Sequence, residues 1–249
     1  MDSSLSQYML SIITATLNER GNVSQFVDRV KKVVGKEPHE IIVVDDNSSD
    51  GTIELLEKIS LSNPNLRMIV NSRREGLLKS NLRGLKESRG RIKIVMDADL
   101  QHPPEMIGNI VNSLERGQDF AVMSRFVHGS QIYNRNPYRE YATSLAISLC
   151  HWIVPQTRKF KDPISGFFAI NSNVKVPYEK LYDLFGNQRG YKILVPIIAN
   201  NVKKKIVELP YYFGNRCWGA SKIGMENLLI PRYLTELSQY HSLFKESVS

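Results

Sequence analysis

Short apolar segments alternate with amphipathic helical segments along the first half of the chain, and this alternation restricts the fold more than any other feature. Five apolar segments are predicted to be strands, namely residues 9–14, 40–44, 66–70, 91–97 and 120–124. Apolar residues at helical spacing follow each of the first four, in residues 23–34, 53–59, 79–89 and 103–116. Such alternation is typical of βαβ units with right-handed crossovers, so we predict an α/β fold with a mostly parallel sheet.

Acidic side chains follow three of the predicted strands at the point where each strand ends. Glu19 lies in the loop after the first strand, Asp45 and Asp46 follow the second, and Asp97 and Asp99 follow the fourth. Ligands of such sheets bind outside the carboxyl ends of the strands. We therefore expect these three loops to converge on one crevice.

The Asp97-Ala98-Asp99 segment ends the fourth predicted strand. Alternate residues of a strand share a face, so both carboxylates can point the same way. Two like charges this close favour a bound cation, and Mg²⁺ or Mn²⁺ with oxygen ligands is the natural partner. Gln101 adds a neutral oxygen, whereas His102 is expected to form a loop hydrogen bond and not to bind metal. The alternative is an acidic surface loop, because Asp-x-Asp is a common sequence.

Composition excludes several classes of protein. The 249 residues suit a single domain, and the net charge of +8 favours an anionic partner such as a phosphorylated substrate, an anionic membrane or nucleic acid. The two cysteines suit neither a disulfide framework nor a zinc site, and are typical of a reducing compartment. We find no Gly-x-Gly-x-x-Gly sequence, no P-loop, no signal peptide and no apolar run of membrane-spanning length.

Six sequence blocks together resemble the family-two glycosyltransferases of GT-A fold, and among them the polyprenyl-phosphate (dolichol-phosphate) mannosyltransferases. The blocks are TATLNE (14–19), IIVVDDNSSDGT (41–52), MDADLQHPPE (96–105), SRF (124–126), DPISGFF (162–168) and NRCWGASKIG (215–224). The resemblance implies one GT-A domain, Rossmann-like, over residues 1–249. Residues 9–125 would form the nucleotide-sugar half, and residues 126–249 the acceptor-facing and membrane-facing half with interfacial helices.

The resemblance also implies an activity. This would be metal-dependent, inverting transfer of mannose from GDP-mannose to dolichyl or polyprenyl phosphate. The alternatives are glucosyl transfer from UDP-glucose, transfer to a soluble glycan or protein, and an inactive nucleic-acid-binding or scaffolding protein that retains the fold. We expect no nucleic-acid partner. We expect peripheral attachment to the cytoplasmic face of a membrane, through a membrane partner subunit or by electrostatic adsorption.

The resemblance assigns roles to individual residues. The nucleotide would be bound by Ala15, Leu17, Glu19, Val44 and Asp46. The donor diphosphate would be bound by Asp97, Ala98 and Asp99, with Asp97, Asp99 and Gln101 as metal ligands. A C-terminal loop would clamp the diphosphate through Arg216 and Lys222. The family's usual Pro-Thr-Tyr-Asn-Glu is Ala15-Thr16-Leu17-Asn18-Glu19 here, so the aromatic contact to the base is missing.

The sugar and the acceptor phosphate would contact a second group, Arg125, Asp162 and Arg139. The catalytic residues would be Asp99, Arg125 and Arg139. Structural alternatives stay open: Asp46 could cap a helix, Asp162 could begin a turn before Pro163, Arg125 could be a solvated strand end, and Glu19 could close a surface turn.

A helix predicted to begin at Asn136-Pro137 has an apolar stripe formed by Tyr138, Tyr141, Leu145, Leu149 and Trp152. The stripe could pack in the core, as most such stripes do. Because Tyr and Trp favour the membrane interface, and because the resemblance implies a lipid phosphate acceptor, we predict that this helix lies on the bilayer. Further helices are predicted over residues 175–185, 191–200 and 225–243, with a strand over residues 206–213.

Overall fold

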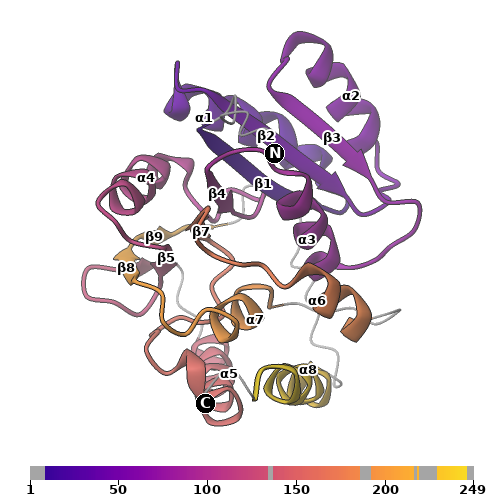
Figure 1. Ribbon diagram of the computed structural model, residues 1–249. Helices are drawn as coiled ribbons and strands as arrows, with labels where there is room; N and C mark the ends of the chain where they lie inside the picture. Colours follow the sequence, from indigo (N-terminus) through magenta and orange to yellow (C-terminus); the bar gives the residue numbers. More distant parts are fainter. Residues whose placement is uncertain (1–8, 134–136, 186–191, 216–217, 219–228, 246–249) are drawn as a thin grey trace, which may run out of the picture.

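A seven-stranded sheet forms the centre of the molecule in the computed structural model, which describes residues 9–133, 137–185, 192–215, 218 and 229–245 (Figure 1). The strand order is β3-β2-β1-β4-β7-β5-β8. The strands are β1 Leu10–Thr16, β2 His39–Asp45, β3 Leu66–Val70, β4 Ile92–Val95, β5 Phe120–Ser124, β7 Phe168–Asn171 and β8 Ile206–Pro210. Only β7 pairs antiparallel with its neighbours in this sheet. The predicted α/β fold with a mostly parallel sheet is confirmed.

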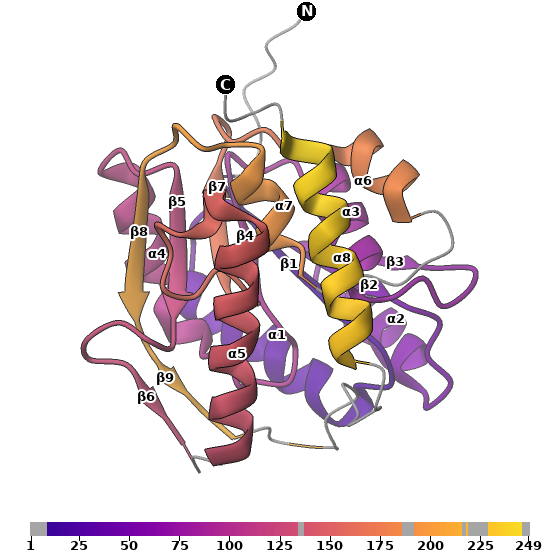
Figure 2. The same cartoon turned by 90° about the horizontal axis from the view of Figure 1, so that it is seen from below.

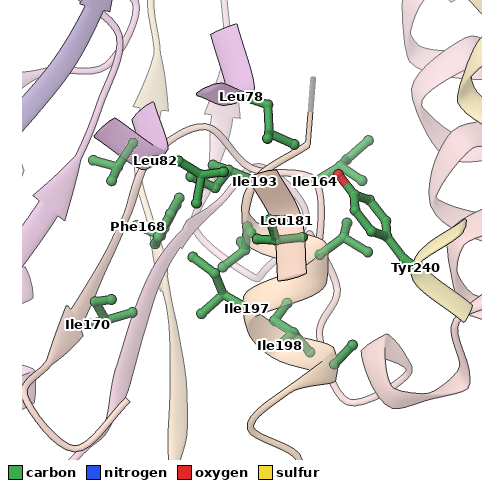
Figure 3. Close-up of a cluster of buried hydrophobic side chains, with 14 of the residues drawn as sticks. Leu78, Leu82, Ile164, Phe168, Ile170, Leu181, Ile193, Ile197, Ile198 and Tyr240 are labelled. Carbon is green, nitrogen blue, oxygen red and sulfur yellow. The ribbon is translucent and has the colours of Figure 1, made fainter. Parts of the chain in front are cut away.

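Helices cover both faces of the sheet. Successive strand residues point to opposite sides, so a strand of apolar residues needs a helix packed on each side. One face packs on α1 Arg20–Val34, α2 Thr52–Ser62 and α4 Ile107–Glu115. The other packs on α3 Leu77–Glu87, α5 Pro137–Ile153, α6 Tyr178–Phe185, α7 Leu194–Ala199 and α8 Leu229–Phe244. Figure 3 shows part of this second core, where Phe168 and Ile170 of β7 face Leu82 of α3 and Ile197 of α7. In the part of the chain that the structure describes, no helix is both long and apolar enough to cross a membrane.

The direction of strand addition reverses between β1 and β4. From β1 the sheet extends through β2 to β3, whereas β4 and the later strands lie on the other side. In open parallel sheets a crevice forms at such a reversal, outside the carboxyl ends of the strands. The loops after β1, β2 and β4 therefore end at one edge, and about 10 Å separates the outer two at the usual strand spacing.

Several boundaries differ from those predicted. Asn22, a natural cap residue, lies buried within α1, which begins at Arg20. The helix expected over residues 103–116 is divided into a 3-10 turn, Pro104–Met106, and α4. The last predicted strand is broken after β8, and its continuation β9, Tyr212–Phe213, pairs with β6, Gln131–Ile132, in a separate small sheet.

Candidate active site

Asp46, which follows β2, fixes the loop that leads into α3. Its carboxylate accepts hydrogen bonds from the backbone N–H groups of Glu75 (2.7 Å) and Gly76 (2.9 Å), and from Asn71 Nδ2 (3.0 Å). The alternative that Asp46 caps the helix after β2 is wrong, since Asp50 accepts the Thr52 N–H there (3.0 Å). Asp46 therefore holds the loop before α3 in place, and among the described residues its Oδ2 accepts one hydrogen bond, from Gly76.

The loops after β1 and β2 are joined to each other by hydrogen bonds. The Asn18 N–H donates to Ser48 Oγ (2.8 Å) and the Glu19 N–H donates to Thr52 Oγ1 (3.0 Å). Glu19 is buried at the start of α1, so it does not close a solvent-exposed turn. Val44 is fully buried in the core, so only its main chain could contact a ligand. Ala15 and Leu17 are half-buried in the same region.

The Asp97–Gln101 segment follows β4, on the other side of β1 from Asp46. The side chain of Asp97 is 43% exposed, whereas Asp99 is buried and accepts the Gln101 N–H at Oδ1 (3.1 Å). Ala98 between them is also buried. Leu100 has a φ of 64°, in the left-handed region that costs a non-glycine residue about 1 kcal/mol or more. This strained residue directly follows the exposed Asp97 and the buried Asp99 in the loop after β4.

His102 stabilises the Asp97–Gln101 segment through a hydrogen bond and a ring contact. Its Nδ1 accepts the backbone N–H of Asp97 (3.0 Å), and its ring stacks on Phe167 with centroids 5.3 Å apart. Burial lowers the pKa of His102 to about 4. A neutral ring whose Nδ1 already accepts a hydrogen bond is a loop hydrogen-bonder, as the sequence predicted.

The low pKa of His102 makes stability depend on pH. Above pH 6.5 the ring is neutral in both folded and unfolded chains, whereas between pH 6.5 and 4 only the unfolded chain takes up a proton. Stability should therefore fall as the pH falls from 6.5 to 4.5, by roughly 2–3 kcal/mol from this residue. Urea unfolding with EDTA, at both pH values, should show this component in the wild type and not in His102→Asn. An identical pH dependence in the two proteins would contradict the assignment.

Arg125, at the end of β5, forms a buried ion pair with Asp162. The guanidinium donates from Nε to Oδ2 and from Nη2 to Oδ1, both at 2.8 Å, and the Arg125 N–H donates to Oδ2 (3.1 Å). Burial opposes the charge of Arg125, but the hydrogen bonds and charge of Asp162 outweigh it and raise the pKa of the guanidinium. The alternative of a solvated strand end is wrong for Arg125, and Asp162 is a fully buried partner that orients it.

Lys192 is a cation of this region that the sequence analysis missed. It lies half-buried just before α7, and its charge acts on Arg125, Asp162 and Asp97. Burial lowers the pKa of Lys192, and the Arg125 charge adds to this, while nearby carboxylates act in the opposite direction. Within the described residues, the Lys192 ammonium has no hydrogen bond or ion pair. No sequence pattern identifies Lys192 as a site residue, because the charged residues around it are far apart in the sequence and come together only in the fold.

The segment after β9 contacts the loop after β4 and the start of α1. Gln101 Nε2 donates to Gly214 O (3.2 Å), and the Gly214 N–H donates to Gln101 O (3.2 Å). Asn22 Nδ2 in α1 donates to Trp218 O (3.1 Å). A Cβ added to Gly21 would come within 2.4 Å of the Trp218 ring, so the close approach depends on glycine at this position. Arg216 and Lys222, and the side chain of Arg139, lie outside the described residues.

The aromatic stripe of α5 is on the surface. Tyr138 is 86% exposed, Tyr141 73% and Trp152 73%, whereas Leu149 is partly buried against the core. In Figure 2 the helix lies along one side of the molecule, beside α8 and with β6 and β9 near its Pro137 end. The alternative that this stripe packs in the core is therefore wrong for its aromatic residues.

Comparison with known proteins gives a consistent result. The model of glycosyl transferase family 2 matches residues 11–182. A dolichol-phosphate mannosyltransferase from Pyrococcus furiosus is 37% identical over 214 residues, which cover 86% of this chain and 59% of that protein. A dolichol-phosphate mannosyltransferase from Saccharomyces cerevisiae is 31% identical, covering 93% of this chain and 86% of that protein. The chain thus spans less than two thirds of the Pyrococcus relative and most of the yeast one.

Solved structures show the same architecture. A mannosyltransferase from Pyrobaculum calidifontis, in complex with GDP-Man and Mn²⁺, superposes with a TM-score of 0.58 at 19% identity. The superposition covers 90% of this chain and 60% of that structure. At this identity the likeness concerns the fold, which is GT-A.

Proposed function

Because the chain belongs to glycosyl transferase family 2 and is a glycosyltransferase, we propose that it transfers mannose from GDP-mannose to a polyprenyl or dolichyl phosphate. One observation supports this most: oxygen ligands and cations meet at the same edge of the sheet. Asp97 and Asp99 supply negative charge there, and Arg125 and Lys192 supply positive charge. Negative charge is needed to bind the metal of a metal–diphosphate, and positive charge is needed to bind the acceptor phosphate. The names of the relatives support mannose and a prenyl phosphate, and the Pyrobaculum complex supports GDP and Mn²⁺.

The donor set fits a hard divalent ion, Mg²⁺ or Mn²⁺. Asp97, Asp99 and the Oε1 of Gln101 offer oxygen only, and the neutral His102 is already engaged. Among the described residues, no group of three or more His, Cys, Asp or Glu side chains could hold a metal. This suits Mg²⁺-type sites, which combine one or two carboxylates with substrate phosphates. When bound, the ion would neutralise charge that develops on the leaving diphosphate.

The reaction joins an acceptor phosphate oxygen to the anomeric carbon and breaks the bond from that carbon to the donor diphosphate. A phosphate monoester has a second pKa of about 6, so at neutral pH the acceptor is mostly a dianion and needs no strong base. It needs orientation and shielding from the negative donor. Asp162 fixes the plane of Arg125 through Nε and Nη2, and Nη1, for which the described part of the chain offers no hydrogen-bond acceptor, would donate to a phosphate oxygen. In-line displacement would invert the configuration, from an α-linked donor to a β-linked lipid phosphate.

The decisive assay follows radiolabelled sugar into a short polyprenyl phosphate. We expect label from GDP-mannose with Mn²⁺ or Mg²⁺, and none with EDTA. Transfer from UDP-glucose alone would contradict GDP-mannose as the donor, but the reaction would still be hexosyl transfer to a prenyl phosphate. Transfer only to a soluble glycan or protein would contradict the lipid acceptor. If no donor is consumed in the presence of metal, the chain is a binding protein with this fold.

The exposed aromatic side chains of α5 are proposed to dock on the bilayer and guide the prenyl chain. Peripheral attachment at the cytoplasmic face would bring the lipid phosphate to the crevice, with help from a membrane partner subunit or from the chain's net positive charge. Tyr and Trp prefer this interfacial position.

Replacing Tyr138, Tyr141 and Trp152 together by serine should lower binding to anionic liposomes at least about tenfold, because three exposed aromatic side chains that would insert into the membrane interface are lost. Sedimentation with liposomes measures this. Leu61→Ser is the matched control, since Leu61 is 90% exposed on α2 and away from α5. Unchanged sedimentation of the triple variant would reject the docking surface.

A further inference from the structure

Trp218 lies on the first turn of α1, although Asn22 in that turn and Trp218 are 196 residues apart in the sequence. The Trp218 carbonyl accepts a hydrogen bond from Asn22 Nδ2 (3.1 Å), and the indole ring covers Gly21. Asn22 is fully buried, and its Nδ2 also donates to Glu19 Oε2 (2.5 Å). One buried side chain therefore joins Trp218 to the loop after β1.

The indole ring of Trp218 is still 69% exposed. Single exposed apolar side chains are common on protein surfaces, so exposure alone does not indicate a ligand. This ring differs in that Gly21 and Asn22 fix its position at the start of α1, next to the proposed substrate crevice. A large flat apolar surface is thus held at a defined place, where a second flat ring could stack on it.

The segment that carries Trp218 begins at the metal end of the proposed crevice. Gly214 exchanges two hydrogen bonds with Gln101, in the loop after β4, whereas Trp218 contacts the helix that follows β1. β1 lies between β4 and β2 in the sheet. With the proposed metal–diphosphate at Asp97 and Asp99, after β4, the nucleoside would extend across β1 toward β2. The base would then arrive at the end where Trp218 lies.

The loops around the crevice offer no other exposed aromatic ring for this base. Residues 17–19, 46–51 and 71–76 contain no Phe, Tyr or Trp, and His102 after β4 is buried. A membrane could also cover an exposed tryptophan. However, α1 packs on the opposite face of the sheet from α5, which carries the proposed membrane surface. The position of Trp218 therefore favours the nucleotide.

We propose that Trp218 stacks on the base of the donor nucleotide, and that Gly21 provides the space in which its ring lies. This inference rests on the proposed function, because the donor is a nucleoside diphosphate sugar. It adds a binding residue that lies beyond residues 11–182, the part matched by the family model. Every base has a flat face, so this contact contributes affinity without selecting guanine or uracil.

Fluorescence tests the contact without turnover. The chain has two tryptophans, so the Trp152→Phe variant retains Trp218 as its single indole. GDP added with Mg²⁺ should quench this emission, with the same Kd that calorimetry gives for GDP. Binding of GDP with unchanged emission, or a change of emission with anionic liposomes and none with GDP, would overturn the proposal and leave the proposed function intact. If neither GDP nor UDP binds, both are contradicted.

Substitutions separate stacking from simple anchoring of the segment. Trp218→Ala should raise the Kd of GDP about tenfold, and Trp218→Leu by nearly as much, because both remove the aromatic face. Trp218→Phe keeps a ring and should stay within about threefold of the wild-type Kd. Equal Kd values for Trp218→Leu and Trp218→Phe would show that the side chain only anchors the segment, and would overturn the proposal.

Gly21→Ala tests the space under the ring and leaves Trp218 unchanged. An added Cβ would lie 2.4 Å from the ring, so the indole must move and the Kd of GDP should rise about tenfold. Gly108→Ala is the matched control, since Gly108 is also helical, in α4, and an added Cβ there meets nothing within 4 Å. Combined with Trp218→Ala, Gly21→Ala should add little, because both remove one contact. A wild-type Kd in Gly21→Ala, or fully additive losses, would overturn the role of Gly21.

Discussion

Asp99→Asn is expected to lower kcat by roughly 10²–10³-fold, because the proposed ion that stabilises the leaving diphosphate loses a charged ligand. Asparagine has nearly the same shape, and its amide oxygen can still accept the Gln101 N–H that Asp99 Oδ1 accepts now (3.1 Å). The melting temperature should therefore stay close to that of the wild type. Steady-state transfer at saturating GDP-mannose and Mn²⁺ measures the effect.

Glu105→Gln is the matched control for Asp99→Asn. Glu105 lies on the same β4–α4 connection, but its carboxylate forms a surface ion pair with Arg29 (2.6 Å) and is 54% exposed. Exposed pairs contribute about 0–1 kcal/mol, so this variant should keep both its stability and its activity. If Asp99→Asn retained more than half of the wild-type kcat, Asp99 would not be a ligand of a catalytic ion.

Asp162→Ala is expected to destabilise the protein by about 3–5 kcal/mol, because it leaves the Arg125 guanidinium buried without its partner. Asp162 is fully buried and the side chain of Arg125 is 19% exposed, so solvent cannot replace the two 2.8 Å hydrogen bonds. A loss of this size should lower the melting temperature by roughly 10 °C in a chain of this length. Denaturant unfolding and thermal melting measure both quantities.

Activity should fall with stability in Asp162→Ala, since the orientation of Arg125 toward the acceptor is lost as well. Arg29→Gln, which breaks the surface pair with Glu105, should change stability by less than about 1 kcal/mol. An Asp162→Ala protein that unfolds within 1 kcal/mol of the wild type would mean that the pair is weak. Arg125 would then need another explanation for its position.

The parts of the fold that depend on local pattern were predictable. Alternating apolar segments and helical spacing predicted the strands and helices of the first half, because each element buries a face of its own residues. β7 was not predicted. It is four residues long, shares only Phe168 with the DPISGFF block (162–168), and takes its place through antiparallel pairing with β4 and β5, which are far away in sequence.

The site was predictable to a similar extent. The convergence of the loops after β1, β2 and β4 follows from strand order, but the partners of individual side chains do not. Asp46 was expected to be a ligand or a helix cap, and it anchors the loop before α3. The Lys192 N–H donates to Glu236, and the charge of Arg125 acts on Lys192, only because α7 and α8 pack beside the sheet. Such contacts join residues that no local pattern relates.

Electron paramagnetic resonance of Mn²⁺ tests the central claim most directly, namely that Asp97 and Asp99 hold an ion together with a nucleoside diphosphate. The account predicts one bound Mn²⁺ per chain when GDP is present, much weaker binding of Mn²⁺ without GDP, and no GDP-dependent binding in the Asp97→Asn, Asp99→Asn double variant. Equal Mn²⁺ binding by the wild type and the double variant in the presence of GDP would contradict it.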